Sequence, residues 1–296
     1  MKNRYVVVTP ARDEEETLPF TIESMRKQNI QPTRWIIVDD GSTDRTLEIA
    51  REAEAEIPWL EVVTRKNRGH RALGGGVVDT FDEGFEALNG IEWDFVVKLD
   101  ADLSFEQDYF ERLIVLFDEQ PRLGMASGKT YLMTDGEKSI EWCHDEHVRG
   151  PAKMYRRECY EEIGGLVAVR GWDMIDETRA QMGGWTTRSY TEIELIHHRP
   201  IDGRQSNVLQ SRYDMGKLYH FLGYHPLYHL ARSVRSAVQD FPILVGGIAL
   251  LAGYIVAWAS GRERYDEAYC QFVGKKQMER FSLSHLAQYF RESIFG

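Results

Sequence analysis

Two short apolar segments of this chain each end in a cluster of acidic residues, and this pattern restricts the fold more than any other feature. Residues 35–38 lead into Asp39-Asp40-Gly-Ser-Thr-Asp44, and residues 95–99 lead into Asp100-Ala-Asp102. Short β-branched segments with polar boundaries are typical of buried parallel strands. Because ligands of an open α/β sheet bind beyond the carboxyl ends of its strands, both clusters are expected to face one crevice.

Strands and helices are expected to alternate over the first 115 residues. This rhythm is typical of a mostly parallel sheet with helices on both faces, whose first half is Rossmann-like and suited to a nucleotide. The expected strands are 5–8, 35–38, 60–64 and 95–99, and the expected helices are one that begins near Asp13, one at 43–55 and one at 73–88.

The pattern becomes less regular after residue 123 but is consistent with the second half of the same domain. Strands are expected at 124–130 and 191–197, with a helix at 158–163 between them. The predicted organisation is therefore an α/β domain over residues 1–205, followed by a helical region over residues 206–296.

The formal net charge of −11 for 296 residues argues against a general nucleic-acid-binding protein, because such proteins are usually basic. The charge is unevenly distributed. Residues 199–296 contain 12 Lys and Arg against 8 Asp and Glu, whereas residues 1–198 contain 24 against 39. A basic tail on an acidic body predicts that the tail meets an anionic partner, most commonly a membrane surface.

The three cysteines are widely spaced and form no CxxC pair, so neither a disulfide framework nor a zinc knuckle is indicated. The first residues lead directly into a predicted strand, without the apolar stretch of a signal peptide. Both features favour a cytoplasmic protein, and the basic tail favours a place at the inner face of the cell membrane.

Residues 241–260 contain no charged side chain, and about twenty apolar residues are enough to cross a bilayer as a helix. Pro242 and three glycines interrupt the segment, and arginines flank it on both sides, so positive charge favours neither orientation. We expect membrane contact, either by spanning or by lying in the plane. The alternative is a buried helix of the core or of a dimer, since the glycines could let the segment pair with a second copy.

The Asp100-Ala-Asp102 cluster suits a divalent metal. Carboxylate oxygens are hard ligands that fit Mg²⁺ or Mn²⁺ bridging phosphates. One carboxylate of the pair can contact the metal while the other orients a ribose or a metal-bound water, and the cation would stabilise a departing diphosphate.

The segment Asp40-Gly-Ser-Thr-Asp44 has a simpler interpretation as a strand-to-helix turn. Ser42 or Thr43 could accept hydrogen bonds from the first amides of the helix, with Asp44 near its positive end. The neighbouring acidic clusters favour the functional interpretation.

A third acidic cluster, Asp173-Met-Ile-Asp176-Glu177, follows the Gly164-Gly165 corner. Asp173 is a candidate for the base that deprotonates an acceptor hydroxyl, provided that it lies within hydrogen-bond reach. Asp176 is the main competitor, although Asp176 and Glu177 are also what the solvated first turn of a helix would contain.

Taken together, these residues resemble the family 2 glycosyltransferases of the GT-A fold, which transfer a sugar from a nucleoside-diphosphate-sugar and invert its anomeric centre. The resemblance covers about residues 4–200 and depends on the segments 8–14, 39–44, 67–72 and 100–102. It implies a base at Asp173, a metal ligand at Asp102, and nucleotide-binding roles for Thr9, Pro10, Arg12, Glu14, Asp40, Arg71 and Asp100.

The chain departs from the family pattern in the acceptor segment, where the usual Gly-Glu-Asp is Gly171-Trp172-Asp173. The aspartate keeps its place, and Arg179 stands where the family has a later arginine. Similar enzymes often place a histidine near the diphosphate or metal at the position of His197, which implies a second metal ligand, although a lone histidine is more often structural. The sequence contains no Gln-x-x-Arg-Trp motif of processive synthases, which favours transfer of a single sugar.

The implied function is transfer of one sugar from a nucleoside-diphosphate-sugar, by family weighting a UDP-sugar, to a hydroxyl acceptor. The membrane-seeking tail suggests a lipid-linked acceptor in the assembly of a cell-surface polysaccharide or glycolipid. Two alternatives are a catalytically silent scaffold of such an assembly complex and a sugar-1-phosphate nucleotidyltransferase, although the latter usually has a Gly-rich loop where this chain has Arg12-Asp-Glu-Glu. A dinucleotide oxidoreductase is disfavoured because Gly74-Gly-Gly76 lacks GxGxxG spacing.

Overall fold

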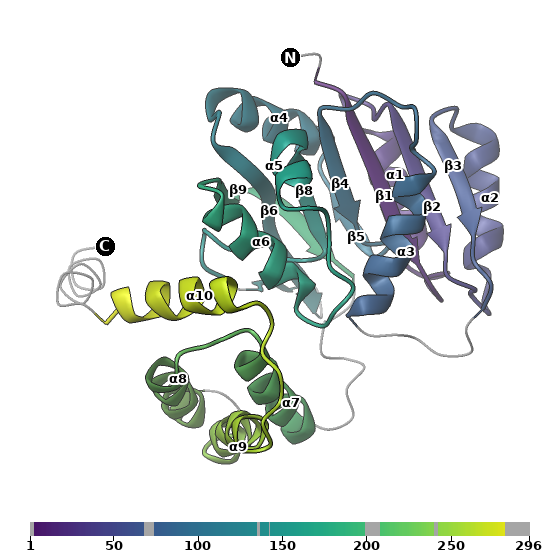
Figure 1. Cartoon of the computed structure of the whole chain (residues 1–296). Coiled ribbons are helices and arrows are strands. Elements are labelled where there is room, and N and C mark those ends of the chain that lie inside the picture. The colour runs from purple at the N-terminus through teal and green to yellow at the C-terminus, as the bar shows by residue number, and fades with distance from the viewer. Residues whose placement is uncertain are drawn as a thin grey trace. The chain divides into compact units, whose positions relative to one another are not determined.

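The computed structural model describes residues 3–67, 74–134, 137–141, 143–198, 208–239 and 242–281. Its contacts divide the chain into two compact units, Met1–Ile201 and Asp202–Gly296. The first is an α/β unit and the second is helical (Figure 1).

One mixed sheet organises the first unit. Its strands lie in the order β3-β2-β1-β4-β8-β6-β9-β5, and β7 pairs with β6 off this path. The bounds are β1 (Tyr5–Ala11), β2 (Arg34–Asp39), β3 (Leu60–Thr64), β4 (Phe95–Leu99), β5 (Leu103–Phe105), β6 (Leu123–Thr134), β7 (Glu137–Ile140), β8 (Ala152–Arg156) and β9 (Thr186–His197).

The directions of the strands bring the ends of several strands to one edge of the sheet. Strands β1 to β4 are mutually parallel, β8 is antiparallel to both β4 and β6, and β9 is parallel to β6. Strands β2, β4 and β9 therefore run in the same direction. Their carboxyl ends, together with the start of β8, meet at the edge where ligands of such sheets bind.

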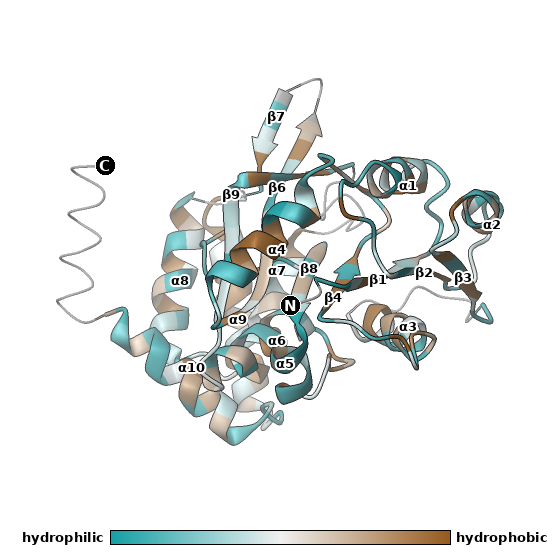
Figure 2. Ribbon diagram, turned by 90° about the horizontal axis from the view of Figure 1, so that it is seen from above, coloured by the Kyte–Doolittle hydropathy of each residue, from teal (hydrophilic) through white to brown (hydrophobic). Residues whose placement is uncertain are grey.

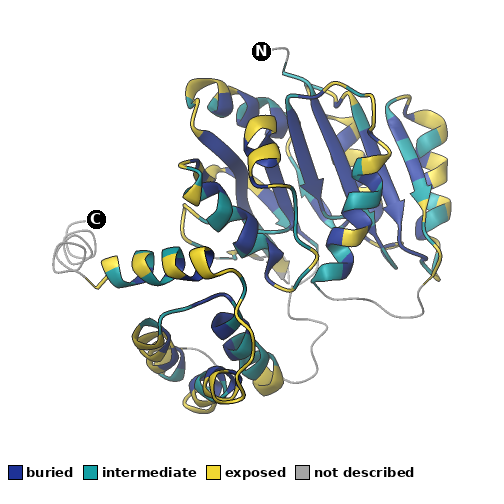
Figure 3. Ribbon diagram, in the orientation of Figure 1, coloured by how far each residue is buried: buried dark blue, intermediate teal, exposed yellow. Residues whose placement is uncertain are grey.

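Helices cover both faces of this sheet and enclose two cores. Side chains of α1 (Leu18–Arg26), α2 (Thr46–Glu56) and α4 (Tyr109–Glu119) belong to one core, and those of α3 (Gly75–Glu86), α5 (Arg157–Glu162) and α6 (Trp172–Met182) belong to the other. Figure 2 shows α1 and α2 on one side of the sheet and α3 on the other. Alternate residues of the buried strands supply the two cores. Figure 3 shows that the central strands are buried.

The strands at 60–64 and 95–99 were predicted with their observed bounds, and the predicted strand at 124–130 is extended at both ends. Strand β8 was not predicted. The helix expected at 43–55 begins at Thr46, and Asp44, not Ser42 or Thr43, accepts the amide of its first residue (3.0 Å). The Ser42 hydroxyl instead accepts from the amide of Asp13 (3.1 Å).

The second unit contains α7 (Val208–Phe221), α8 (Pro226–Gln239), α9 (Val245–Ala259) and α10 (Glu267–Glu279). The apolar segment predicted at 241–260 corresponds mainly to α9, while residue 241 lies outside the described residues. In the part of the chain that the structure describes, we find no helix that combines the length and the apolarity needed to cross a membrane.

Gly84 sets the distance between α3 and the sheet. A Cβ atom at this position would lie 2.5 Å from Val8 Cγ1 and 2.6 Å from Val38 Cγ2. We predict that Gly84→Val lowers the free energy of unfolding by about 1–3 kcal/mol, because it overpacks this contact. Urea denaturation would measure the loss, with Glu86→Ala at an exposed position of the same helix as the control. Equal stability of the two variants would contradict the prediction.

Candidate active site

The carboxyl end of β4 carries a buried lysine that pairs with the acidic cluster after it. Lys98 Nζ contacts Asp100 Oδ1 and donates to the carbonyl of Gly150 (2.8 Å). Burial raises the pKa of the Asp100 carboxyl, although the Lys98 ammonium acts in the opposite direction. Lys98 therefore ties the cluster to the segment that precedes β8.

Asp102 lies against the end of β9, as the topology requires. Its Oδ2 is 3.3 Å from His197 Nε2, and the other ring nitrogen of His197 is 3.4 Å from Glu141 Oε2. Burial lowers the pKa of His197, but the hydrogen bonds to these two carboxylates outweigh it and raise the pKa to about 9. Glu141 is in turn paired with Arg149 (3.0 Å).

Asp102 retains one oxygen that fits a cation. Its Oδ1 is buried, and among the described residues no donor reaches it. A buried carboxylate oxygen needs a partner, and a divalent ion would suit it. Within the same described ranges, however, no three His, Cys, Asp or Glu side chains converge as a metal site. The His197 ring separates Asp102 from Glu141, which explains why these three do not converge.

Asp40, at the end of β2, lies between two guanidinium groups. Its Oδ2 is 3.6 Å from Arg12 Nη1, and its Oδ1 is 3.3 Å from Arg65 Nη1. Gly41 follows at φ +73°, and a Cβ there would lie 2.4 Å from the Cα of Asn67. Only glycine fits so close an approach at positive φ. The predicted nucleotide-binding residue Arg71 lies outside the described residues.

The β1–α1 loop and the β2–α2 loop are bound to each other in both directions. Asp13 Oδ1 accepts the amide of Thr43 (2.8 Å), while Asp44 Oδ2 accepts the amide of Glu15 (3.1 Å) and the amide of Glu14 donates to Thr46 Oγ1 (2.7 Å). These reciprocal bonds fix the loops that carry Arg12 and Asp40.

The remaining predicted nucleotide residues lie on or beside β1. The Thr9 hydroxyl accepts from Trp35 Nε1 (2.9 Å), and the whole residue is buried. Glu14 is buried, and its carboxylate accepts from the Thr17 hydroxyl (2.8 Å). Pro10 is half-buried in β1.

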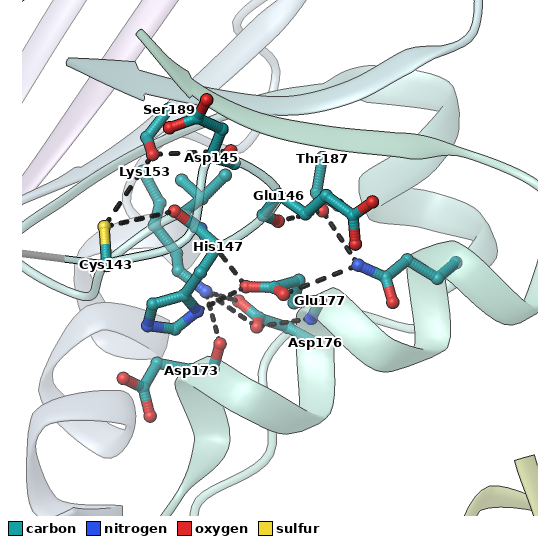
Figure 4. A network of polar contacts seen from close by, with 12 residues as sticks. Cys143, Asp145, Glu146, His147, Lys153, Asp173, Asp176, Glu177, Thr187 and Ser189 are labelled. Atoms are coloured by element: carbon teal, nitrogen blue, oxygen red, sulfur yellow. Dashed lines mark hydrogen bonds and ion pairs between the residues drawn. The ribbon is translucent and has the colours of Figure 1, made fainter. Parts of the chain in front are cut away.

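Asp173 lies in the first turn of α6, and a buried lysine binds its backbone carbonyl. Its carbonyl accepts from Lys153 Nζ (2.6 Å), which also binds both oxygens of Asp176 (2.8 and 3.0 Å). Figure 4 shows the Asp173 carboxylate directed away from this network. The partly exposed carboxylate is therefore accessible while its backbone is fixed.

Asp176 and Glu177 do not form the solvated first turn that was expected. Asp176 is 1% exposed, and it also accepts from the Tyr155 hydroxyl (2.6 Å). Burial raises the pKa of Asp176 to about 6, although Lys153 lowers it. Glu177 accepts the amide of Val148 (3.2 Å) and contacts His147 Nδ1 (2.8 Å). The expectation was wrong because α6 begins at Trp172, one turn earlier than assumed.

Two buried lysines and one glycine connect Asp173 with the acidic cluster Asp100-Ala-Asp102 that follows β4. The ammonium groups of Lys98 and Lys153 lie 5.3 and 5.4 Å from the ring centroid of Trp172. A Cβ at Gly150, whose carbonyl binds Lys98, would be 3.6 Å from Asp173 Oδ2. Asp173, Asp100 and Asp102 thus belong to one side of the unit. Sequence reasoning missed Arg65, Glu141, Lys98 and Lys153 as parts of this arrangement, and only the lysine just before the acidic cluster offered a local signal.

We predict that Asp176→Ala lowers the free energy of unfolding by about 3–5 kcal/mol, because it leaves the Lys153 ammonium buried without a carboxylate. The double variant Lys153→Met/Asp176→Leu should recover most of this loss. Urea denaturation would measure both. Glu161→Ala, which breaks an exposed pair with Arg157, is the control and should cost less than about 1 kcal/mol. A similar cost for Asp176→Ala and Glu161→Ala would refute the role of the buried pair.

A family model and curated relatives of this chain all indicate a glycosyltransferase. The family model described as Glycosyl transferase family 2 matches residues 6–170. An undecaprenyl-phosphate 4-deoxy-4-formamido-L-arabinose transferase of Serratia proteamaculans is 33% identical over 271 residues, which cover 85% of this chain and 74% of the relative. A 4,4'-diaponeurosporenoate glycosyltransferase of Staphylococcus haemolyticus is 30% identical over 126 residues, covering 42% of this chain and 31% of the relative. The match thus spans about a third of the length of the first curated relatives.

Solved structures share the fold at low sequence identity. The mannosyltransferase PcManGT from Pyrobaculum calidifontis, in complex with GDP-Man and Mn²⁺, has a TM-score of 0.54 at 16% identity, with 98% of this chain and 84% of that chain covered. S. aureus TarS 1–349 in complex with UDP-GlcNAc has a TM-score of 0.54 at 14% identity, with coverage of 88% and 73%. The predicted GT-A type of fold with a helical C-terminal region is confirmed. Since the family model matches more than half of its length and a 33% identical relative covers most of it, the chain belongs to glycosyl transferase family 2.

Proposed function

We propose that the protein transfers a single sugar from a nucleoside-diphosphate-sugar to a hydroxyl of a lipid-linked acceptor, with inversion of the anomeric centre. The observations that support this proposal are the unsatisfied oxygen of Asp102 and the partly exposed carboxylate of Asp173, on segments that Lys98 and Gly150 connect. The first suits a cation beside a diphosphate, and the second suits a base beside an acceptor.

The nucleotide would bind across the ends of β1 and β2. Asp40 is the candidate for recognition of the base, with Arg12 and Arg65 orienting its carboxylate. Thr9, Pro10, Glu14 and Arg71 complete the proposed set. UDP is the first donor nucleotide to test because of the family resemblance, and GDP is the second because PcManGT was solved with GDP-Man.

Asp102 would hold Mn²⁺ or Mg²⁺, and Asp100 would orient the ribose or a water of the ion. When bound, such an ion supplies positive charge for the diphosphate as it leaves. His197 could join as a ligand only if its Nε2 exchanged the Asp102 contact for the ion. The neighbouring structure with Mn²⁺ supports the choice of metal.

The proposed chemistry is a direct displacement in which Asp173 acts as the base. Its carboxylate takes the proton of the acceptor hydroxyl as that oxygen forms a bond to the anomeric carbon. The bond between this carbon and the diphosphate oxygen breaks, and the nucleoside diphosphate leaves with the electron pair. Lys153 keeps Asp173 in place through its carbonyl. Asp176 is less suited to the role because its carboxylate is buried and bound to Lys153.

A lipid-linked acceptor is supported by the relatives, several of which are named undecaprenyl-phosphate transferases. We place the reaction at the inner face of the cell membrane, in the assembly of a polysaccharide or glycolipid. A poly-β-1,6-N-acetyl-D-glucosamine synthase of Staphylococcus aureus is also among the relatives, at 28% identity over 117 residues. Single transfer remains our proposal because the Gln-x-x-Arg-Trp motif is missing from the sequence.

We predict that Asp102→Asn abolishes the metal-dependent part of nucleotide binding, because it removes the charged oxygen proposed for the ion. Isothermal titration with UDP, GDP and other nucleoside diphosphates, with and without Mn²⁺, would measure this. Asp118→Asn, at an exposed position of α4, is the matched control and should bind as the wild type does. If no nucleotide binds the wild type, the scaffold alternative is preferred.

We predict that Asp173→Asn lowers kcat by about 10²- to 10⁴-fold while leaving nucleotide affinity unchanged, since the amide cannot accept the proton. Transfer of radiolabelled sugar to a polyprenyl-linked sugar, which provides the acceptor hydroxyl, measures turnover, and titration measures affinity. Asp118→Asn again serves as the control. Full activity of Asp173→Asn would reject this residue as the base, and formation of a nucleotide-sugar from a sugar phosphate would favour the nucleotidyltransferase.

A further inference from the structure

Helix α8 is amphipathic, but its apolar side faces outward. Its buried residues are His229, Ser233 and Ser236. Its large apolar residues are between 45% and 67% exposed, namely Leu227, Leu230, Val234 and Val238. Their spacing places them on one side of the helix. In a water-soluble unit the apolar stripe normally faces the core, so this arrangement is reversed.

Helix α9 is apolar on both sides. Its buried side contains Gly246, Gly247 and Gly253 together with Leu250 and Tyr254. On its other side, large apolar side chains are 47% to 68% exposed, namely Ile248, Ile255, Val256 and Trp258. Figure 3 shows buried and exposed residues on both helices.

The glycines of α9 let backbones approach closely within the second unit. A Cβ at Gly253 would lie 1.9 Å from the carbonyl oxygen of Tyr213, and a Cβ at Gly247 would lie 2.4 Å from that of Ser233. Small residues between helices and large apolar residues on the outside are how helices pack in lipid.

The link between the two helices extends the same surface. Ile243 and Leu244 are each 61% exposed, and the amide of Leu244 donates to the carbonyl of Ala237 (2.7 Å), which holds the link against α8. The exposed apolar side chains of α8, α9 and this link are here called the outer apolar face. An exposed apolar surface carried by two adjacent helices marks an interaction site.

Positive charge at the rim of this face identifies the partner. Arg235 is exposed on α8 beside the apolar stripe, and Arg262 and Arg264 are exposed just after α9. Arg235 donates to Gln239 (2.7 Å). Long basic side chains at the edge of an apolar surface reach lipid phosphates. Two copies joined through this face would instead bring like charges together.

We propose that the outer apolar face inserts into one leaflet of an anionic membrane, with α8 and α9 lying in the interface. The fifteen residues of α9 span about 22 Å, less than the ~30 Å hydrocarbon core of a bilayer. This surface adds to the proposed function the place where a lipid-linked acceptor would be met. Vesicle binding is measured without turnover, so either proposal can fail alone.

The test is flotation of the full chain with vesicles of phosphatidylcholine, with or without phosphatidylglycerol. Leu230→Glu/Val234→Glu should bind the anionic vesicles at least about tenfold more weakly than the wild type, because it places two charges in the apolar stripe. The control is Ala268→Glu/Gln271→Glu, which adds the same charge at exposed positions of α10 and should bind as the wild type does. Circular dichroism and nucleotide titration verify that each variant is folded.

A second variant tests the lipid charge. Arg235→Gln should weaken binding to the anionic vesicles about fivefold and leave binding to neutral vesicles unchanged. Failure of the wild type to float with anionic vesicles, or equal flotation of the Leu230→Glu/Val234→Glu variant, overturns the proposal. A wild-type dimer that this variant dissociates, without any flotation, would assign the face to a second copy.

The depth of Trp258 distinguishes lying in the interface from crossing. Lipids that carry a quencher near the headgroup should quench its fluorescence more than lipids with the quencher near the chain end. The signal of Trp258 is obtained as the difference from Trp258→Phe. Stronger quenching from the chain end would overturn the in-plane arrangement.

Discussion

The acidic side chains of the candidate site depend on two lysines that the fold buries. The side chains of Lys98 and Lys153 are 3% and 0% exposed, and an ammonium group in the interior is tolerated only where carboxylates and carbonyls surround it. Lys98 therefore draws Asp100 and the Gly150 carbonyl together, and Lys153 draws the Asp173 carbonyl toward Asp176. The contacts that neutralise these two buried charges therefore also position the acidic clusters. Both ammonium groups lie within 5.4 Å of the centroid of the Trp172 ring.

The first half of the fold could be predicted because its local signals agree. Strands β3 and β4 are short apolar segments with clear boundaries, and their bounds were predicted correctly. Strand β8 was missed because its five buried residues, Ala-Lys-Met-Tyr-Arg, include two cations. A buried strand is recognised by its apolar run, and here partners distant in sequence replace apolarity. Arg156 donates to the carbonyl of Leu123 (2.9 Å), a contact that no local pattern reveals.

Only the residues of the candidate site that directly follow a recognisable strand could be predicted from the sequence. Asp40, Asp100 and Asp102 follow strands that are visible in the sequence, and parallel strands deliver their ends to one edge. The partners of these residues come from segments that local reasoning cannot place. Glu141 contacts His197 across 56 residues, and Arg65 reaches Asp40 from the segment after β3. Such long-range pairs follow from the register of the sheet, which depends on all strands together.

The two loops at the ends of β1 and β2 exchange hydrogen bonds in both directions. Neither loop has its observed conformation independently of the other, so the effects of substitutions in the two loops should not be additive. The consequence concerns how such a site can be altered, in evolution or by design. A β2–α2 loop taken from another transferase would lose the acceptors that its amides require unless the matching β1–α1 loop came with it. The smallest exchangeable part of the nucleotide side is therefore the pair of loops.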